Sequence, residues 1–334
     1  MKTNENLPKI SIIMTCYTLD RLNDIKQLLD SIQAQTYKNI EVLVVTERSL
    51  ELTESLKAYV NEKGYPGIAI LRNEGEWGAS SSRNFGIKHA SGDVLAFIDD
   101  DALLLPGWAE GTAKTYAGDS SIMGLTGPIL PLWEKSSMSW FPREFYWIFS
   151  CTYSDWTEKT EVRNGYGTNI SFRRETFDLC GLFRTNLGAK GGGESGKHEL
   201  GGEETDFSLR VTRKTGKRIV YDPEVKVRHR VYGYRLTTNF IVKRAFWEGC
   251  TKAMLNKLYR FDTKGKAVLS NEYELLYDIV FKLLVRVLKL LFGQPLVALR
   301  QLWVITIVLP CVAAGYLAYT LPYLFHRRQP YGAE

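Results

Sequence analysis

Three consecutive aspartates could hold a metal ion. Asp99, Asp100 and Asp101 directly follow the apolar run at 93–98, "DVLAFI", which reads as a buried strand. Like charges at this spacing repel one another, so a cation or hydrogen-bond donors must compensate them. Carboxylate oxygens suit Mg²⁺ or Mn²⁺, and strand alternation points Asp99 and Asp101 to the same side. The triplet therefore predicts a divalent-metal site, with a solvated acidic loop as the alternative.

A second acidic group ends the stretch Gly191–Asp206, "GGGESGKHELGGEETD". The spacing to Gly196 and Lys197 is one residue short of a P-loop, but His198 stands where a Ser or Thr must meet Mg²⁺. A nucleoside-triphosphate hydrolase is therefore disfavoured. The glycines instead predict a loop that closes over substrates beside the carboxylates. Lys197 and His198 either touch an acceptor phosphate or are solvated loop residues.

The stretch at 73–93, "NEGEWGASSSRNFGIKHASGD", lies upstream of the aspartates. Gly75, Gly78 and Gly86 permit close backbone approach. Arg83, near an expected helix start, can bind a phosphate together with the helix N-terminus. Taken alone, each glycine is a turn residue.

Alternating strands and helices must position these groups. Hydrophobic patterns predict strands at 9–17, 40–45, 68–71 and 93–98, and helices at 20–35, 50–62 and 82–89. This alternation predicts an α/β fold with a mostly parallel, Rossmann-like sheet, whose active site lies beyond the carboxyl ends of the strands. The first strand is followed by "TCYTLDRL", which lacks the GxGxxG turn of a dinucleotide oxidoreductase.

Charge and cysteine usage limit the partners. The net charge of +6 is spread over 43 basic and 37 acidic residues without a long basic run, so we expect no nucleic-acid partner. The net positive charge instead favours attraction to an anionic membrane surface or to phosphorylated substrates. The five cysteines form no CxxC pair, which favours reduced thiols in a cytosolic domain.

The C-terminal part is apolar. Leu302–Phe325 carries no charge and is long enough to cross a ~30 Å hydrocarbon core. A buried core helix and a re-entrant hairpin broken at Pro310 are the alternatives. Tyr273–Phe292 places a thin basic stripe on an apolar helix, a pattern typical of a helix in the membrane interface.

These patterns divide the chain at 235 and 294. We expect a catalytic domain at 1–235, a helical region with the interfacial helix at 236–294, and a transmembrane or re-entrant segment at 295–334. The polar N-terminus keeps the catalytic domain on the cytoplasmic side. One span would leave Arg327 and Arg328 on the far side, mildly against the positive-inside tendency, and a re-entrant segment or a homo-oligomer would ease that conflict.

Four blocks carry a resemblance to a known family. "SIIMTCYTLDRL", "RNEGEWGASSSRNFGIKHASGDVLAFIDDDA", "YGTNISFRRETFDLCGLF" and "GGEETDFSLRV" stand in the order and spacing of a family 2 glycosyltransferase of the GT-A fold. The resemblance spans roughly residues 8–235. The later block "VRHRVYGYRLTTNFIVKRAFWEGCTKA" is similar to the membrane-associated branch that extends polyprenyl-linked sugars, such as glucosyl-dolichyl phosphate glucuronosyltransferases.

The resemblance implies roles for individual residues. Glu204 matches the catalytic base of inverting members, with Glu203 as a competitor. The family usually has aspartate at the base position and a paired aspartate where this chain has Thr46 and Glu47, which puts uridine specificity in doubt. The other implied roles are donor binding by Thr15, Tyr17, Glu47, Arg83, Asn84, Asp99 and Asp100, metal binding by Asp99, Asp101 and His229, and acceptor-side contacts by Asn169, Asp206 and Trp247.

The resemblance also implies the reaction. An acceptor hydroxyl attacks the anomeric carbon of a nucleotide sugar, UDP-linked in the family pattern, with inversion and with Mn²⁺ or Mg²⁺. The implied acceptor is a polyprenyl- or dolichyl-phosphate-linked sugar in a membrane, and a polysaccharide or protein acceptor is the alternative. The chain has no QxxRW motif of a processive synthase, so we expect a single transfer. An alternative from a non-enzyme class is a non-catalytic membrane scaffold of the same fold.

Overall fold

The computed structural model describes residues 7–188 and 200–325. The chain forms two compact units, one of 1–132 with 150–231 and one of 133–149 with 232–334. The glycine stretch with Lys197 and His198 lies outside the described residues, as do Arg327 and Arg328.

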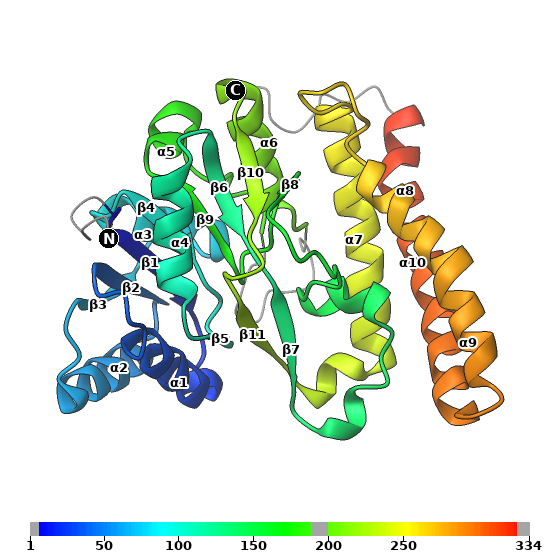
Figure 1. Cartoon of the computed structure of the whole chain (residues 1–334), viewed down its shortest axis with the longest axis horizontal. Coiled ribbons are helices and arrows are strands. Elements are labelled where there is room, and N and C mark those ends of the chain that lie inside the picture. Colours follow the sequence, from blue (N-terminus) through cyan, green and yellow to red (C-terminus); the bar gives the residue numbers. More distant parts are fainter. Residues whose placement is uncertain (1–6, 189–199, 326–334) are drawn as a thin grey trace. The chain divides into compact units, whose positions relative to one another are not determined.

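The first unit is built on an eight-stranded sheet (Figure 1). Its order is β3 (Ile68–Asn73), β2 (Ile40–Glu47), β1 (Ile10–Cys16), β4 (Val94–Phe97), β9 (Ile170–Arg173), β6 (Ile122–Thr126), β10 (Arg218–Tyr221) and β8 (Thr160–Val162). The strands β3, β2, β1 and β4 are parallel, whereas β9 and β8 run antiparallel to their neighbours. The predicted mostly parallel α/β sheet is thus confirmed.

Helices follow the strands as their apolar spacing requires. They are α1 (Leu22–Gln33), α2 (Leu50–Lys63), α3 (Ala79–His89), α4 (Trp108–Gly118), α5 (Glu175–Cys180) and α6 (Glu203–Thr215). In α1 the buried residues Ile25, Leu28, Leu29 and Ile32 recur at helical spacing and cover the sheet. A 3-10 turn, η2 (Leu19–Arg21), precedes α1 where the pattern predicted continuous helix from residue 20.

Helix α3 starts three residues earlier than its apolar pattern predicted. Gly78 adopts φ 116° directly before it, a conformation that glycine reaches without a steric penalty, and helix begins at Ala79. Within α3, Gly86 lies against Ile13 of β1, where an added Cβ would overlap the isoleucine side chain. Helix α3 therefore packs closely on β1.

A three-stranded sheet extends the same unit. Its order is β5 (Ala102–Leu104), β11 (Val227–Val231) and β7 (Ile129–Trp133). Strands β5 and β11 are antiparallel, and Ala102 pairs with His229. Because β5 begins directly after the aspartate triplet, this register brings the histidine to the aspartates.

The second unit is helical. It contains the 3-10 turns η3 (Ser136–Met138), η4 (Arg143–Phe149) and η5 (Gly233–Leu236), then α7 (Thr238–Tyr259), α8 (Ser270–Tyr277), the π-helical η6 (Asp278–Leu283), α9 (Leu284–Leu290) and α10 (Pro295–Phe325). The helix expected at 273–292 is therefore formed by α8, η6 and α9 together.

Helix α10 is the long apolar helix at the C-terminal end. Within the described residues, Pro295–Leu321 is the one helical stretch long and apolar enough to cross a membrane, with a mean hydropathy of 2.0. The helix continues through Pro310, so the alternative of a hairpin broken at that proline is wrong. Proline already has a helical φ and costs the helix one backbone hydrogen bond, which apolar helices tolerate.

Candidate active site

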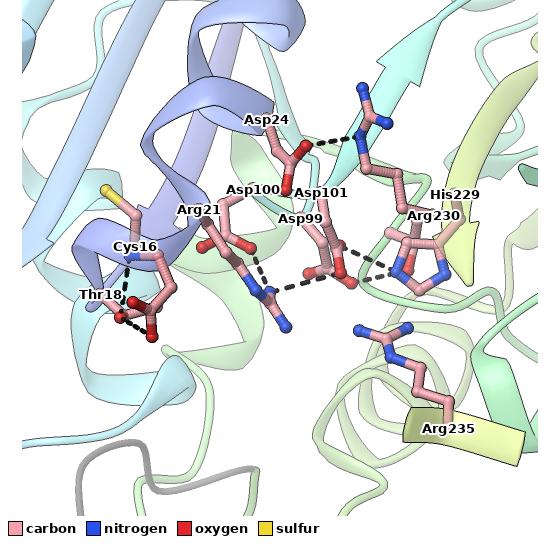
Figure 2. A network of polar contacts seen from close by, with 12 residues as sticks. Cys16, Thr18, Arg21, Asp24, Asp99, Asp100, Asp101, His229, Arg230 and Arg235 are labelled. Atoms are coloured by element: carbon pink, nitrogen blue, oxygen red, sulfur yellow. Dashed lines mark hydrogen bonds and ion pairs between the residues drawn. The ribbon is translucent and has the colours of Figure 1, made fainter. Parts of the chain in front are cut away.

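The aspartate triplet lies just beyond the end of β4 in the first unit (Figure 2). Asp100 and Asp101 are buried, while Asp99 is partly exposed. Thr168 Oγ1 donates a hydrogen bond to Asp99 Oδ2 over 2.6 Å. The triplet thus sits at the carboxyl end of a central strand, as the sequence predicted.

His229 completes a group of metal-ligand type with two of the aspartates. Its Nε2 lies 2.8 Å from Asp101 Oδ1, and one ligand atom each of Asp99, Asp101 and His229 lie within 4.8 Å of one another. Burial alone would lower the pKa of His229, but the charge and hydrogen bond of Asp101 raise it to about 10. The two carboxylates and the imidazole fit Mn²⁺ or Mg²⁺, although a bound ion must displace the imidazole proton.

Arg21 supplies positive charge to the other side of the triplet (Figure 2). Its Nη1 lies 2.5 Å from Asp100 Oδ1 and 3.3 Å from Asp101 Oδ2. The second oxygen of Asp100, Oδ2, is buried and has no hydrogen-bond partner among residues 7–188 and 200–325. Burial, with a smaller contribution from Asp101, raises the pKa of Asp100 although Arg21 opposes this. An unsatisfied buried oxygen is costly, so this atom suits a ligand hydroxyl or a cation.

Arg83 joins the triplet to the second acidic group. This buried side chain of α3 places Nη1 2.9 Å from Glu204 Oε1 and 3.1 Å from Glu203 Oε1, and Nη2 3.3 Å from Asp99 Oδ1. Both glutamates belong to the first turn of α6. Burial, followed by the charge of Glu204, raises the pKa of Glu203 to about 8. The two acidic groups that the sequence identified separately therefore meet on one guanidinium.

Gly167 leaves room for this ion pair. A Cβ added at this position would overlap the Arg83 guanidinium and the Glu204 carboxylate. Sequence reasoning gave no role to Gly167, Thr168 or Arg21. Gly167, Thr168 and Arg21 lie in the blocks "YGTNISF" and "TCYTLDRL", so position within a motif was the available signal.

The ends of the first two strands carry three of the predicted donor-binding residues. Thr15 and Tyr17 stand at the end of β1, and Tyr17 is exposed. Glu47 ends β2, and Ser82 Oγ donates to its Oε1 over 2.8 Å. Burial raises the pKa of Glu47. These positions follow from the parallel order of β2, β1 and β4.

Four residues that were predicted to contact the donor or the acceptor are bonded to other parts of the protein or belong to the second unit. The Asn84 amide exchanges two hydrogen bonds with the backbone of Phe183, at 2.8 and 3.0 Å. Asn169 is buried and bonds to Trp108 Nε1 and the Val225 carbonyl. The remaining two are Asp206, which is buried and pairs with Arg210 over 2.9 Å, and Trp247, which belongs to α7 of the second unit.

The residues of this site can together perform three chemical tasks. Oxygen and imidazole ligands can hold a divalent cation, and a guanidinium 3.3 Å from Asp99 can face an anionic group beside it. Glu204, less buried than Glu203, can accept a proton.

Known proteins are similar to this chain in sequence. The model of glycosyl transferase family 2 matches residues 11–180. A glucosyl-dolichyl phosphate glucuronosyltransferase of Haloferax volcanii is 32% identical, over 92% of the chain and 95% of that protein. The succinoglycan biosynthesis protein ExoM of Rhizobium meliloti is 31% identical, over 65% of the chain and 75% of that protein.

Solved structures share the fold. A mannosyltransferase from Pyrobaculum calidifontis in complex with GDP-Man and Mn²⁺ superposes with a TM-score of 0.61 at 15% identity, over 95% of this chain and 88% of that one. GalNAc-T7 with UDP, GalNAc and Mn²⁺ gives a TM-score of 0.55 at 17% identity, over 84% of this chain and 58% of that one. These likenesses show the GT-A fold. The chain is a glycosyltransferase and belongs to glycosyl transferase family 2.

Proposed function

We propose that this glycosyltransferase moves a single sugar from a nucleoside-diphosphate sugar to a hydroxyl of a polyprenyl- or dolichyl-phosphate-linked sugar, with inversion. The observation that carries the proposal is the contact of Arg83 with both Asp99 and Glu204, at 3.3 and 2.9 Å. It places a candidate proton acceptor beside a candidate cation site.

The donor side uses the ends of β1, β2 and β4. Asp99, Asp101 and His229 would hold Mn²⁺ or Mg²⁺, which when bound neutralises charge on the leaving nucleoside diphosphate. Asp100 Oδ2 accepts a hydrogen bond from a hydroxyl of the nucleotide sugar, because this oxygen has no partner among the described residues. Arg83 carries positive charge toward the diphosphate, while Thr15, Tyr17 and Glu47 line the nucleoside side. Asn84 acts indirectly, through the Phe183 backbone that it holds.

Glu204 is the better base of the two glutamates. Burial and the charge of Glu204 raise the pKa of Glu203, which favours the neutral form of that carboxyl and makes it the poorer proton acceptor. Glu204 takes the proton of the acceptor hydroxyl while the new bond to the anomeric carbon forms and the bond to the diphosphate oxygen breaks. One displacement inverts the anomeric configuration and needs no protein nucleophile.

A lipid-linked acceptor is favoured over a free glycan. The Haloferax volcanii relative is named for a dolichyl phosphate substrate and is matched over 95% of its length. The apolar α10 supports a membrane location, and we place the catalytic unit on the cytoplasmic side. The relative named for succinoglycan biosynthesis supports a polysaccharide acceptor as the second candidate.

The test is product analysis with the purified full-length protein. Radiolabelled UDP-glucuronate, UDP-glucose and GDP-mannose are each offered with dolichyl-phosphate-linked glucose or with a soluble oligosaccharide, with Mn²⁺ or EDTA. We expect one labelled sugar on the lipid-linked acceptor, lost with EDTA. Transfer to the soluble glycan alone, or full transfer in EDTA, would contradict the proposal.

A matched pair of variants tests the base. Glu204→Gln should lower the transfer rate by about 10²–10⁴, the usual contribution of a general base, while Mn²⁺-dependent nucleotide binding persists. Glu203→Gln replaces a carboxyl whose neutral form burial favours, so this variant should lose much less of the transfer rate. If Glu203→Gln proves the more damaging change, the base assignment is wrong.

A further inference from the structure

Most of α10 is not covered by the part of the chain that the structure describes. Only 28% of its most apolar stretch is buried, which separates it from the core helix of a soluble protein. Several of its exposed positions recur at helical spacing and form one stripe of mainly apolar residues along the helix, while Arg300 is exposed outside this stripe. The stripe consists of Leu299, Thr306, Pro310, Ala313, Leu317 and Leu321.

A second apolar stripe runs along α8, η6 and α9. On the inner side of these helices Ile279, Leu283 and Val287 are buried. The outer stripe consists of Tyr273, Tyr277, Phe281, Leu288 and Phe292, and Phe292 is 95% exposed. Residues 291–294 then turn the chain into α10, so the two stripes belong to one helical hairpin within the second unit (Figure 1).

Helix α7 is fixed against the C-terminal half of α10. Added Cβ atoms would overlap the Val312 carbonyl at Gly249 and the Phe246 carbonyl at Gly315, so the two backbones touch. Asn256 Nδ2 also donates to Tyr316 Oη over 3.0 Å. Glycine contacts of this kind allow close helix packing, and α7 must follow α10 wherever it goes.

The difficulty for a transmembrane α10 is the charge on α7. Glu248, next to Gly249, pairs with Lys252 over 2.9 Å, and Lys252 pairs with Glu272 of α8 over 2.8 Å. If Pro295–Leu321 crossed the bilayer, residues 312–316 would lie about 6–12 Å from its centre, given about 1.5 Å rise per residue. That depth is inside a hydrocarbon core of about 30 Å, where each charge is costly.

We propose that α10 does not cross the bilayer, and that the hairpin of α8, η6, α9 and α10 lies in one leaflet with both stripes toward the acyl chains. Exposed Lys282, which also pairs with Asp278 over 2.7 Å, and exposed Lys289 flank the outer stripe. Long basic side chains of this kind reach anionic headgroups. The charged face of α7 stays out of the hydrocarbon. This inference deepens the proposed membrane association and rests on it.

Sidedness separates the two arrangements. The full chain is expressed with one epitope tag before Met1 and another after Glu334, and inverted membrane vesicles are treated with protease. A hairpin in one leaflet leaves both tags on the same face, so both should be digested together. Protection of the C-terminal tag while the N-terminal tag is lost would overturn the inference.

Vesicle binding tests the occupant of the stripes. Phe281→Asp and Leu288→Asp should each weaken binding to vesicles of phosphatidylcholine and phosphatidylglycerol by about tenfold or more, because the charge must enter the leaflet. Phe261→Asp is the matched control, since Phe261 is an exposed aromatic residue outside the stripes. Lys282→Glu should weaken binding to anionic vesicles only.

Two further outcomes are informative. Unchanged vesicle binding together with loss of a dimer in the Phe281→Asp protein would show that a second copy covers the stripes, which overturns the inference. Sugar transfer is assayed in detergent with the same preparations. Absent transfer with intact vesicle binding would contradict the proposed function and leave the hairpin inference standing.

Discussion

At the scale of single residues, the centre of the site is an arginine with three carboxylates. Arg83 contacts Glu203, Glu204 and Asp99, and Gly167 leaves the space in which it does so. A buried cation of this kind is stable only while its partners stay in place. The geometry at this point is therefore sensitive to a single added methyl group.

Gly167→Ala tests that sensitivity. The new Cβ must push Arg83 away from Glu204, so we expect transfer to fall at least tenfold and the free energy of unfolding to fall by about 1–3 kcal/mol, as for other overpacked sites. Steady-state kinetics and urea unfolding measure the two effects. Gly118→Ala is the control, because nothing lies within 4 Å of a Cβ there. Equal behaviour of the two variants would contradict this account.

Residue types identified the acidic groups of the site but not their connections. The Asp99–Asp101 triplet was found because clustered carboxylates are unusual without compensation, whereas the Glu203–Glu204 pair was assigned from the resemblance. That Arg83 bridges them depends on contacts between α3 and α6, 120 residues apart, which no local pattern records. Nor could a local pattern show that Asn169, predicted to contact the acceptor, is bonded to Trp108 and Val225.

At the scale of elements, the partly buried Glu41 links the first strands of the sheet. Glu41 of β2 accepts hydrogen bonds from Ser11 of β1, from Ser91 and from Gly92, and pairs with Lys9 over 2.9 Å. Burial alone would raise its pKa, but the hydrogen bonds from Ser11 and Ser91 and the contact with Lys9 lower it to about 2. The charged form is therefore favoured by folding.

The pH dependence of Glu41→Gln follows from that shift. Because the folded pKa is lowered, the ionised carboxylate stabilises the fold above pH 4.5, and this contribution is lost as the pH falls toward 2. At pH 7 we expect the variant to lose about 1–3 kcal/mol of unfolding free energy, a typical cost for a charged hydrogen-bond partner. The difference in unfolding free energy between the variant and the wild type, measured by urea titration, should become smaller below pH 4.5.

Glu54→Gln serves as the control for this measurement. Glu54 pairs with Lys57 on the exposed surface of α2, where such pairs contribute little. If the difference in unfolding free energy between Glu41→Gln and the wild type stays constant from pH 7 to pH 3, the account of Glu41 is contradicted.

Strands and helices were predicted where periodicity is strong. The buried run of β1 and the spacing of α1 are confirmed, whereas the 3-10 turn η2 and the early start of α3 depend on turn geometry rather than on apolar spacing. The alternative of a break at Pro310 was wrong because a long apolar helix tolerates one missing hydrogen bond. The pairing of β5 with β11 depends on residues far apart in sequence and could not be read locally.

At the scale of the whole molecule, ligand binding should stabilise the folded chain. A nucleotide with Mn²⁺ that binds the native state alone adds about 2.7 kcal/mol at a concentration of 100 times its Kd. We expect UDP or GDP with Mn²⁺ to raise Tm, and ATP or NAD to leave it unchanged. In Asp101→Asn the metal-dependent part of the shift should vanish. Stabilisation by ATP or NAD alone, indifferent to metal, would contradict the assigned chemistry.

The register between β5 and β11 has a consequence for recombination between related transferases. Ala102, the first residue of β5, pairs with His229, and the Asp101 carboxylate meets the imidazole of the same histidine. One inserted or deleted residue between the triplet and β5 would shift Asp101 by one position relative to the pair of Ala102 and His229 and break its contact with the imidazole. Segments 99–104 and 227–231 must therefore come from the same parent in a working chimera, although more than a hundred residues separate them.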